Sequence, residues 1–165
     1  MHAPLQSMKI YLLRHGEAEP HAATDRNRQL TARGRDDVRQ VITDIAAELR
    51  DVSLVIASPY VRAQQTADIA YDVIAVAGQV QIHRETSEAL VPDAFLTDFF
   101  AMLQQCSVDA VLLVSHQPLV GKIVEQLCGK SAAEYAMSTA NLVRIDCDYP
   151  AADCGTFCWI KRPLG

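Results

Sequence analysis

The sequence lacks any long hydrophobic run. No stretch approaches the ~20 apolar residues that a membrane-spanning helix requires, and the amino-terminal residues lack the apolar centre of a signal peptide. We therefore expect a cytoplasmic protein with no membrane partner. Residues 1–7 resemble a flexible leader, and Met8 is an alternative start.

Basic residues are also too few for a nucleic-acid-binding surface. The chain has 15 Lys and Arg against 20 Asp and Glu, which gives a formal net charge of -5. Because nonspecific binding of nucleic acids depends on a basic surface, we expect no nucleic-acid partner. The negative total still leaves room for a local cluster of arginines around an anionic ligand.

The cysteines do not form the pairs that disulfides or metal sites need. Their number, 5, is odd, and their spacing is irregular. Cys154 and Cys158 have the spacing of half a metal site, but no second pair of Cys or His completes four ligands. We expect thiols that behave as small apolar side chains, and neither a metal nor another cofactor.

The apolar residues that are present follow the pattern of an α/β fold. Half of the 165 residues are hydrophobic, which is enough for the core of one domain over residues 8–165. Apolar runs at 9–13, 54–57 and 110–114 predict buried strands, each followed by a segment with helical spacing. The predicted helices cover about 31–49, 61–75, 95–105 and 118–128, with a short strand at 80–82 and a loop at 86–93.

The last third of the chain predicts strands in place of helices. Residues 141–147 and 155–160 are rich in β-branched residues, and the turn signal Asp148-Tyr149-Pro150 separates them. They are typical of a carboxy-terminal β-hairpin, although one of them could instead join the main sheet as a parallel strand. Together the patterns predict an α/β fold, a three-layer α/β/α sandwich around a mostly parallel central sheet.

Three of the predicted strands end at residue types that suit the binding of phosphate or attack on it. The first ends at Arg14-His15-Gly16, the second at Ser58-Pro59 with Arg62 just beyond, and the third at Ser115-His116. Open parallel sheets bind their ligands beyond the carboxyl ends of the strands, so these side chains should meet at one edge. Two histidines and two arginines in one place indicate an enzyme that acts on phosphate.

Four segments resemble the motifs of the histidine phosphatase superfamily, which is also called phosphoglycerate mutase-like. They read LRHGEA at 13–18, RQLTARG at 28–34, SPYVRAQQT at 58–66 and VSHQPLV at 114–120. Their order and spacing match over nearly the whole chain, and they look most like those of the short SixA-type phosphohistidine phosphatases. The resemblance implies a phosphoglycerate mutase-like fold and a metal-independent phosphatase.

The resemblance also implies a role for each residue at this edge. His15 would be the nucleophile and would form a covalent phosphohistidine intermediate. Arg14 and Arg62 would grip the phosphoryl oxygens, and His116 would donate a hydrogen bond to one of them as charge builds. Four further residues are implied at the substrate: Arg28, Gly16, Ser58 and Gln117. For Arg28, a solvated charge at a helix entrance is the alternative.

The proposed nucleophile has to be neutral to attack phosphorus. Neighbouring arginines disfavour the imidazolium form of His15, whereas a bound phosphate dianion favours it, so the sequence leaves its pKa open. The arginines supply the positive charge that a metal would otherwise provide.

The segment after the second helix lacks the general acid of the ester-cleaving members of this family. It reads ETSEALVPD at 85–93, without the aromatic-Glu-Gly signature of those branches. Glu88 resembles a structural position, and Asp93 is either an acid substitute or a loop residue. An alkoxide leaves poorly without a proton, whereas a protonated phosphoimidazole expels neutral imidazole.

We therefore expect a phosphatase that hydrolyses phosphohistidine on a protein partner, either a histidine phosphotransfer domain or a phosphocarrier protein. Two alternatives stay open. One is a small-molecule phosphomonoesterase of the same fold, with Asp93 or Glu88 as its acid. The other is a catalytically silent phosphate-binding module, against which the full set of catalytic side chains argues, since binding alone needs no nucleophile.

Overall fold

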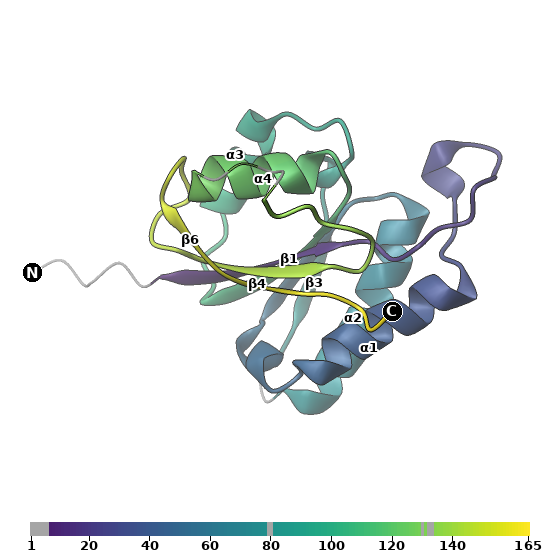
Figure 1. Ribbon diagram of the computed structural model, residues 1–165. Coiled ribbons are helices and arrows are strands. Elements are labelled where there is room, and N and C mark those ends of the chain that lie inside the picture. The colour runs from purple at the N-terminus through teal and green to yellow at the C-terminus, as the bar shows by residue number, and fades with distance from the viewer. Residues whose placement is uncertain (1–6, 79–80, 130, 132–133) are drawn as a thin grey trace, which may run out of the picture.

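A six-stranded sheet forms the centre of the computed structural model, which describes residues 7–78, 81–129, 131 and 134–165 (Figure 1). The strands are Met8–Arg14 (β1), Leu54–Ala57 (β2), His83–Thr86 (β3), Ala110–Ser115 (β4), Leu142–Cys147 (β5) and Gly155–Lys161 (β6). Their order in the sheet is β3-β2-β4-β1-β5-β6. The first four in this order pair in parallel, whereas β5 pairs antiparallel with β1, and β6 pairs antiparallel with β5. The mostly parallel sheet with a terminal hairpin is thus confirmed.

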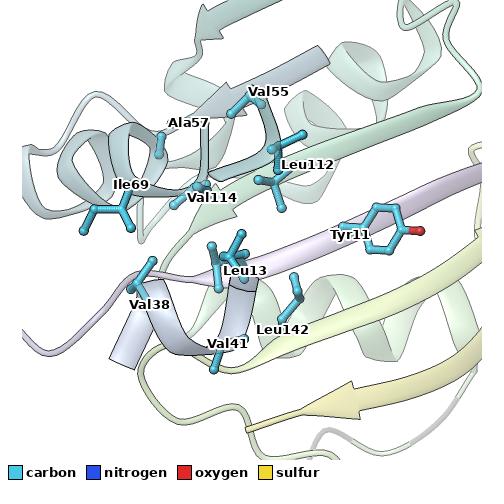
Figure 2. Close-up of a cluster of buried hydrophobic side chains, with 14 of the residues drawn as sticks. Tyr11, Leu13, Val38, Val41, Val55, Ala57, Ile69, Leu112, Val114 and Leu142 are labelled. Atoms are coloured by element: carbon cyan, nitrogen blue, oxygen red, sulfur yellow. The ribbon is translucent and has the colours of Figure 1, made fainter. Parts of the chain in front are cut away.

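Two helices cover each face of this sheet (Figure 1). One face carries α1 (Ala32–Asp44) and α2 (Val61–Ala77), and the other carries α3 (Leu96–Gln104) and α4 (Leu119–Cys128). Successive side chains of a strand point to opposite faces, so Leu13 of β1 packs in the core under α1 and α2 (Figure 2), and Leu12 packs in the other core. The predicted three-layer sandwich is confirmed.

The first helix is shorter than its apolar spacing predicted. It ends at Asp44, and the chain then turns into a short 3-10 helix, η2 (Glu48–Asp51). Leu49 is nevertheless buried in the same core as Val41 and Ile42. The spacing of the apolar residues therefore correctly predicted which side chains are buried on one face of the sheet. It wrongly predicted that one continuous helix carries them.

The strand expected at 80–82 forms further along the chain, at β3. Val80 lies outside the described residues, and all four side chains of β3 are exposed. This strand lies at the edge of the sheet and is held by backbone pairing with β2, so it carries no apolar pattern that a sequence search could find. The loop expected at 86–93 contains a short 3-10 helix, η3 (Glu88–Leu90), whose Leu90 is buried.

Other expectations concern the amino terminus, membranes and cysteines. The leader expected at residues 1–7 lies outside the described residues except for Ser7. Within the described ranges, no helix has both the length and the apolar character to cross a membrane. Four thiols have no disulfide partner: Cys106, Cys147, Cys154 and Cys158.

Candidate active site

A pocket of about 370 Å³ lies at the carboxyl ends of β1 and β4. Arg14 ends β1, His116 directly follows β4, and Arg62 comes from the first turn of α2. The rings of His15 and His116 are 4.9 Å apart between centroids. The pocket is lined by Arg14, His15, Glu17, Ala18, Asp25, Arg28, Arg62, Pro92, His116, Gln117 and Thr139. The structure therefore brings together both histidines and all three arginines selected from the sequence.

Hydrogen bonds to His15 define which of its nitrogens is free to attack. Nδ1 lies 2.7 Å from the carbonyl oxygen of Gly16, which can only accept, so Nδ1 carries the proton. Nε2 then has the lone pair and accepts a hydrogen bond from Nε of Arg62 at 3.2 Å. Burial lowers the pKa of His15 to about 4, and the charges of the nearby arginines act in the same direction. At neutral pH the side chain is a neutral imidazole with Nε2 as its nucleophilic atom.

His116 is held in the complementary arrangement by Ser58. Its Nε2 lies 2.7 Å from the hydroxyl oxygen of Ser58, and that oxygen also accepts a hydrogen bond from the backbone N–H of Tyr60 at 3.3 Å. We assign the hydroxyl as the donor to Nε2, an arrangement that leaves the proton of His116 on Nδ1. Burial lowers the pKa of His116 to about 2, with smaller contributions from His15 and Arg62. The ring is thus neutral and has one N–H.

Two buried donors of the pocket have no protein partner. Among the described residues, Nε of Arg14 and Nδ1 of His116 are the buried side-chain nitrogen and oxygen atoms that make no hydrogen bond. Arg14 is anchored through Nη1, which donates to the carbonyl oxygen of Met137 at 2.9 Å. Leaving a buried donor unpaired is costly, so native proteins rarely do it without a reason. Both atoms belong to residues selected from the sequence for contact with phosphoryl oxygens.

An acidic residue, Asp25, links two of the arginines. Its carboxylate accepts hydrogen bonds from Arg28 at 2.9 Å and from Arg62 at 3.2 Å, and its backbone oxygen accepts a third from Arg62 at 2.7 Å. The hydrogen bond from Arg28, reinforced by Arg62, lowers the pKa of Asp25, so the carboxylate is charged at neutral pH. The sequence gave no signal for these contacts.

Two glycines allow the loop after β1 to approach α1 closely. A Cβ added to Gly16 would lie 2.6 Å from the backbone oxygen of Gly34, and one added to Gly34 would lie 2.1 Å from the backbone oxygen of Glu17. The N–H of Gly16 also donates to the hydroxyl of Thr66, which donates to the carbonyl oxygen of Arg62 one helical turn earlier. This contact explains why glycine stands in the first turn of α1, where its helix propensity is poor.

Of the eight predicted site residues, six line the pocket, and Gly16 and Ser58 are not part of its lining. Gly16 and Ser58 are buried and support His15 and His116 through the hydrogen bonds described above. Gln117 lines the pocket and donates to the same carbonyl oxygen of Met137 that anchors Arg14, at 3.2 Å. The sequence did not reveal Pro92 and Thr139 as wall residues, because neither carries a charge or a motif signal.

Comparison with known proteins agrees with this geometry. A model of the histidine phosphatase superfamily (branch 1) matches residues 10–90. The phosphohistidine phosphatase SixA homolog of Haemophilus influenzae is 35% identical over 136 residues, which span 74% of this chain and 79% of the relative. The chain belongs to the histidine phosphatase superfamily. The family and the enzyme class predicted from its motifs are therefore confirmed.

Other histidine phosphatases match over still more of the chain. The phosphohistidine phosphatase SixA of Escherichia coli K12 is 29% identical over 157 residues, covering 94% of each chain. A solved structure described as the protein histidine phosphatase SixA complexed with tungstate superposes with a TM-score of 0.80 at 30% identity, covering 94% of this chain and 97% of that one. The likeness supports a phosphoglycerate mutase-like arrangement of the sheet and helices.

The two acids considered for ester cleavage lie outside the pocket lining. Glu88 accepts a hydrogen bond from Arg26 at 2.8 Å, and Asp93 lines a neighbouring cavity. The described carboxylates that line the catalytic pocket are instead Glu17 and Asp25. Glu17 accepts a hydrogen bond from the hydroxyl of Thr31, the N-cap of α1, at 2.7 Å.

The described part of the chain contains no cluster of side chains that could form a metal site. There, no group of three His, Cys, Asp or Glu residues lies close enough together to hold an ion. The positive charge of the pocket comes from Arg14, Arg28 and Arg62. A guanidinium group matches the geometry of phosphate and stays charged, so this set suits an anionic phosphoryl group.

Proposed function

We propose that this histidine phosphatase hydrolyses phosphohistidine on a protein, through a covalent intermediate on His15. The observation that carries the proposal is a pocket that holds a neutral histidine nucleophile and whose described carboxylates are already engaged by other protein groups. Its described carboxylates are an ionised Asp25 bound to two arginines and Glu17, which accepts a hydrogen bond from Thr31. Such a pocket suits a substrate whose leaving group needs no proton from the enzyme.

In the first step, Nε2 of His15 attacks the phosphorus. A new P–N bond forms to the enzyme, and the P–N bond of the substrate breaks, so its electron pair returns to the substrate imidazole. If the substrate ring enters protonated, it leaves as neutral imidazole. The Nε–H of Arg14 and the Nδ1–H of His116 would donate hydrogen bonds to phosphoryl oxygens as negative charge builds on those oxygens. Both donors have no hydrogen-bond partner in the free protein.

In the second step, water takes the place of the leaving imidazole. It attacks phosphorus, the P–N bond to His15 breaks, and inorganic phosphate is released. The hydrogen bond from Nδ1 of His15 to Gly16 holds the ring in one orientation through both steps. Nε2 of His15 then regains its lone pair, which again accepts the hydrogen bond from Nε of Arg62, 3.2 Å away in the free protein.

The leaving group decides between phosphohistidine and a phosphate ester. Loss of a general acid costs about 10²- to 10⁴-fold in the rate of ester cleavage. Cleavage of the N–P bond of a protonated phosphohistidine does not lose this factor, because the imidazole leaves as a neutral molecule. The similarity to phosphohistidine phosphatase SixA of Escherichia coli and to the SixA homolog of Haemophilus influenzae supports this choice. A histidine phosphotransfer domain or a phosphocarrier protein is accordingly the proposed partner.

The test compares phosphate release from a histidine-phosphorylated protein with release from an aryl phosphate. Both are followed over many turnovers in the presence of a chelator, with His15→Ala beside the wild type. We expect fast release from the protein, slow release from the ester, and neither in the variant. Fast ester cleavage that depends on His15 would instead show a small-molecule phosphatase, and no turnover of either would show a binding module.

A further inference from the structure

A second cavity adjoins the catalytic pocket. Its volume is about 420 Å³, and its walls include Pro92, Asp93, Phe95, Leu96, Pro118 and Lys122. Pro92 lines both cavities, and Pro118 follows Gln117 of the catalytic pocket, so the two cavities share an edge. We call the second one the Phe95 groove.

Neither packing nor helix capping explains the presence of Phe95 in the lining of this groove. The side chain of Phe95 is 74% exposed. Phe95 also occupies the N-cap of α3, where no side chain accepts a hydrogen bond from the first turn. Ser, Thr, Asn or Asp is favoured at this position because its oxygen would satisfy one of the free N–H groups. The chain thus carries an exposed aromatic ring at a place where a small polar residue would stabilise the helix.

A cation that also lines the groove, Lys122, is placed unfavourably for its own helix. Lys122 is exposed near the start of α4, where the helix dipole disfavours positive charge. It forms no ion pair with the part of the chain that the structure describes. Asp93, by contrast, precedes the start of α3, where a carboxylate is favoured. Two residues of one groove are therefore better suited to contact with another molecule than to their own helices.

We infer that the Phe95 groove docks the protein that presents phosphohistidine to His15. This inference rests on the proposed function. A phosphohistidine that reaches His15 brings the surrounding surface of its own protein over Pro92, the shared edge of the two cavities. The groove then receives an apolar side chain against Phe95 and Leu96, with an acidic group beside Lys122. A small phosphorylated molecule fills the catalytic pocket without touching this groove.

A matched pair of substitutions tests the docking role. Phe95→Ser removes the exposed ring and places a favoured residue at the N-cap, so the variant should fold at least as well as the wild type. Tyr149→Ser is the control, because Tyr149 is 53% exposed in the turn between β5 and β6, at the opposite end of β1 from His15. Each protein is assayed with a helical protein phosphorylated on histidine and with free phosphohistidine.

We expect Phe95→Ser to lower kcat/KM for the phosphorylated protein by about tenfold, as loss of an aromatic anchor at an interface does, and to leave free phosphohistidine unchanged. Lys122→Glu should act in the same direction, and Tyr149→Ser should change neither substrate. Equal values for Phe95→Ser and the wild type on the protein, or an equal loss on both substrates, would overturn the docking role while leaving the proposed function intact. Absence of phosphohistidine turnover by the wild type would overturn the proposed function as well.

Discussion

The hydroxyl oxygen of Ser58 lies 2.7 Å from Nε2 of His116, and both side chains are buried. The backbone of Tyr60 donates to the same oxygen, and we infer that the hydroxyl itself donates to the ring. This bond holds the His116 proton on Nδ1, the nitrogen that has no partner in the pocket. Ser58 is therefore a positioning residue that selects the tautomer of a catalytic histidine.

Replacing this serine should impair catalysis through the tautomer of His116. We expect Ser58→Ala to lower kcat by about tenfold or more, because a ring in the wrong tautomer cannot donate to the phosphoryl group. The ¹⁵N chemical shifts of His116 should show the proton redistributed between the two nitrogens. The control is Ser115→Ala, which removes an equally buried hydroxyl that donates to the carbonyl oxygen of Leu90. An unchanged tautomer in Ser58→Ala would contradict this role.

The buried histidines should make stability sensitive to acid. Their pKa values fall from 6.5 to about 4 for His15 and about 2 for His116. Below pH 6.5 these two histidines therefore bind protons in the unfolded chain but stay neutral in the native chain, until the pH falls to their native pKa values. The free energy of unfolding consequently falls as the pH is lowered. Each histidine contributes a slope of about 1.4 kcal/mol per pH unit between the two pKa values.

Urea denaturation between pH 7 and pH 4 measures this slope. His116→Gln should lose less stability over that range than the wild type, with the difference growing as the pH falls. His21→Gln, at an exposed histidine, controls for the substitution itself. Parallel curves for His116→Gln and the wild type would show that the pKa of His116 is the same in the native and the unfolded protein, and would contradict the lowered value.

The carboxylate of Asp25 should compete with phosphate for the arginines. It occupies N–H groups of Arg28 and Arg62 in the free protein, and its charge repels an incoming dianion. Because its side chain is 58% exposed, solvent weakens the effect, and we expect Asp25→Asn to tighten binding of inorganic phosphate by about two- to fivefold. Calorimetric titration measures the affinity, with Asp93→Asn as a control outside the pocket. Weaker binding would mean that Asp25 chiefly holds the arginines in place.

A methyl group at Gly34 should displace the loop that carries His15. Helix propensity alone predicts that Gly34→Ala stabilises α1 by about 1 kcal/mol. The added carbon would instead lie 2.1 Å from the backbone oxygen of Glu17, which cannot move without shifting the loop. We expect a destabilisation of about 1–3 kcal/mol and a lower kcat, measured against Arg39→Ala on the exposed face of the same helix. A more stable and fully active variant would refute the close approach.

Much of the fold was accessible from the sequence, because the strands that build the core are buried on both faces. The run at 54–57 coincides with β2, and the run at 110–114 falls short of β4 by one residue. The exposed β3 and the turn after Asp44 were not predicted correctly, since both depend on tertiary contacts and leave no periodic pattern.

The site was predictable in its residues more than in its hydrogen bonds. Strand ends located His15, Arg62 and His116, since parallel strands bring their carboxyl ends to one edge. Nothing in the sequence could show that Ser58 faces His116 or that Asp25 bridges two arginines, because both contacts join segments far apart in the chain. Roles that the sequence assigned to Ser58 and Gly16 at the substrate stay predictions, and the structure offers each a supporting position.

Trapping the phosphorylated enzyme tests the central claim most directly. A histidine-phosphorylated protein labelled with ³²P is mixed with the wild type, quenched within milliseconds in alkali and digested for peptide mapping. The account predicts an acid-labile, alkali-stable label on the peptide that contains His15, which appears before phosphate release and is absent from His15→Gln. Phosphate released with no label on His15, or released equally well by the variant, would contradict the account.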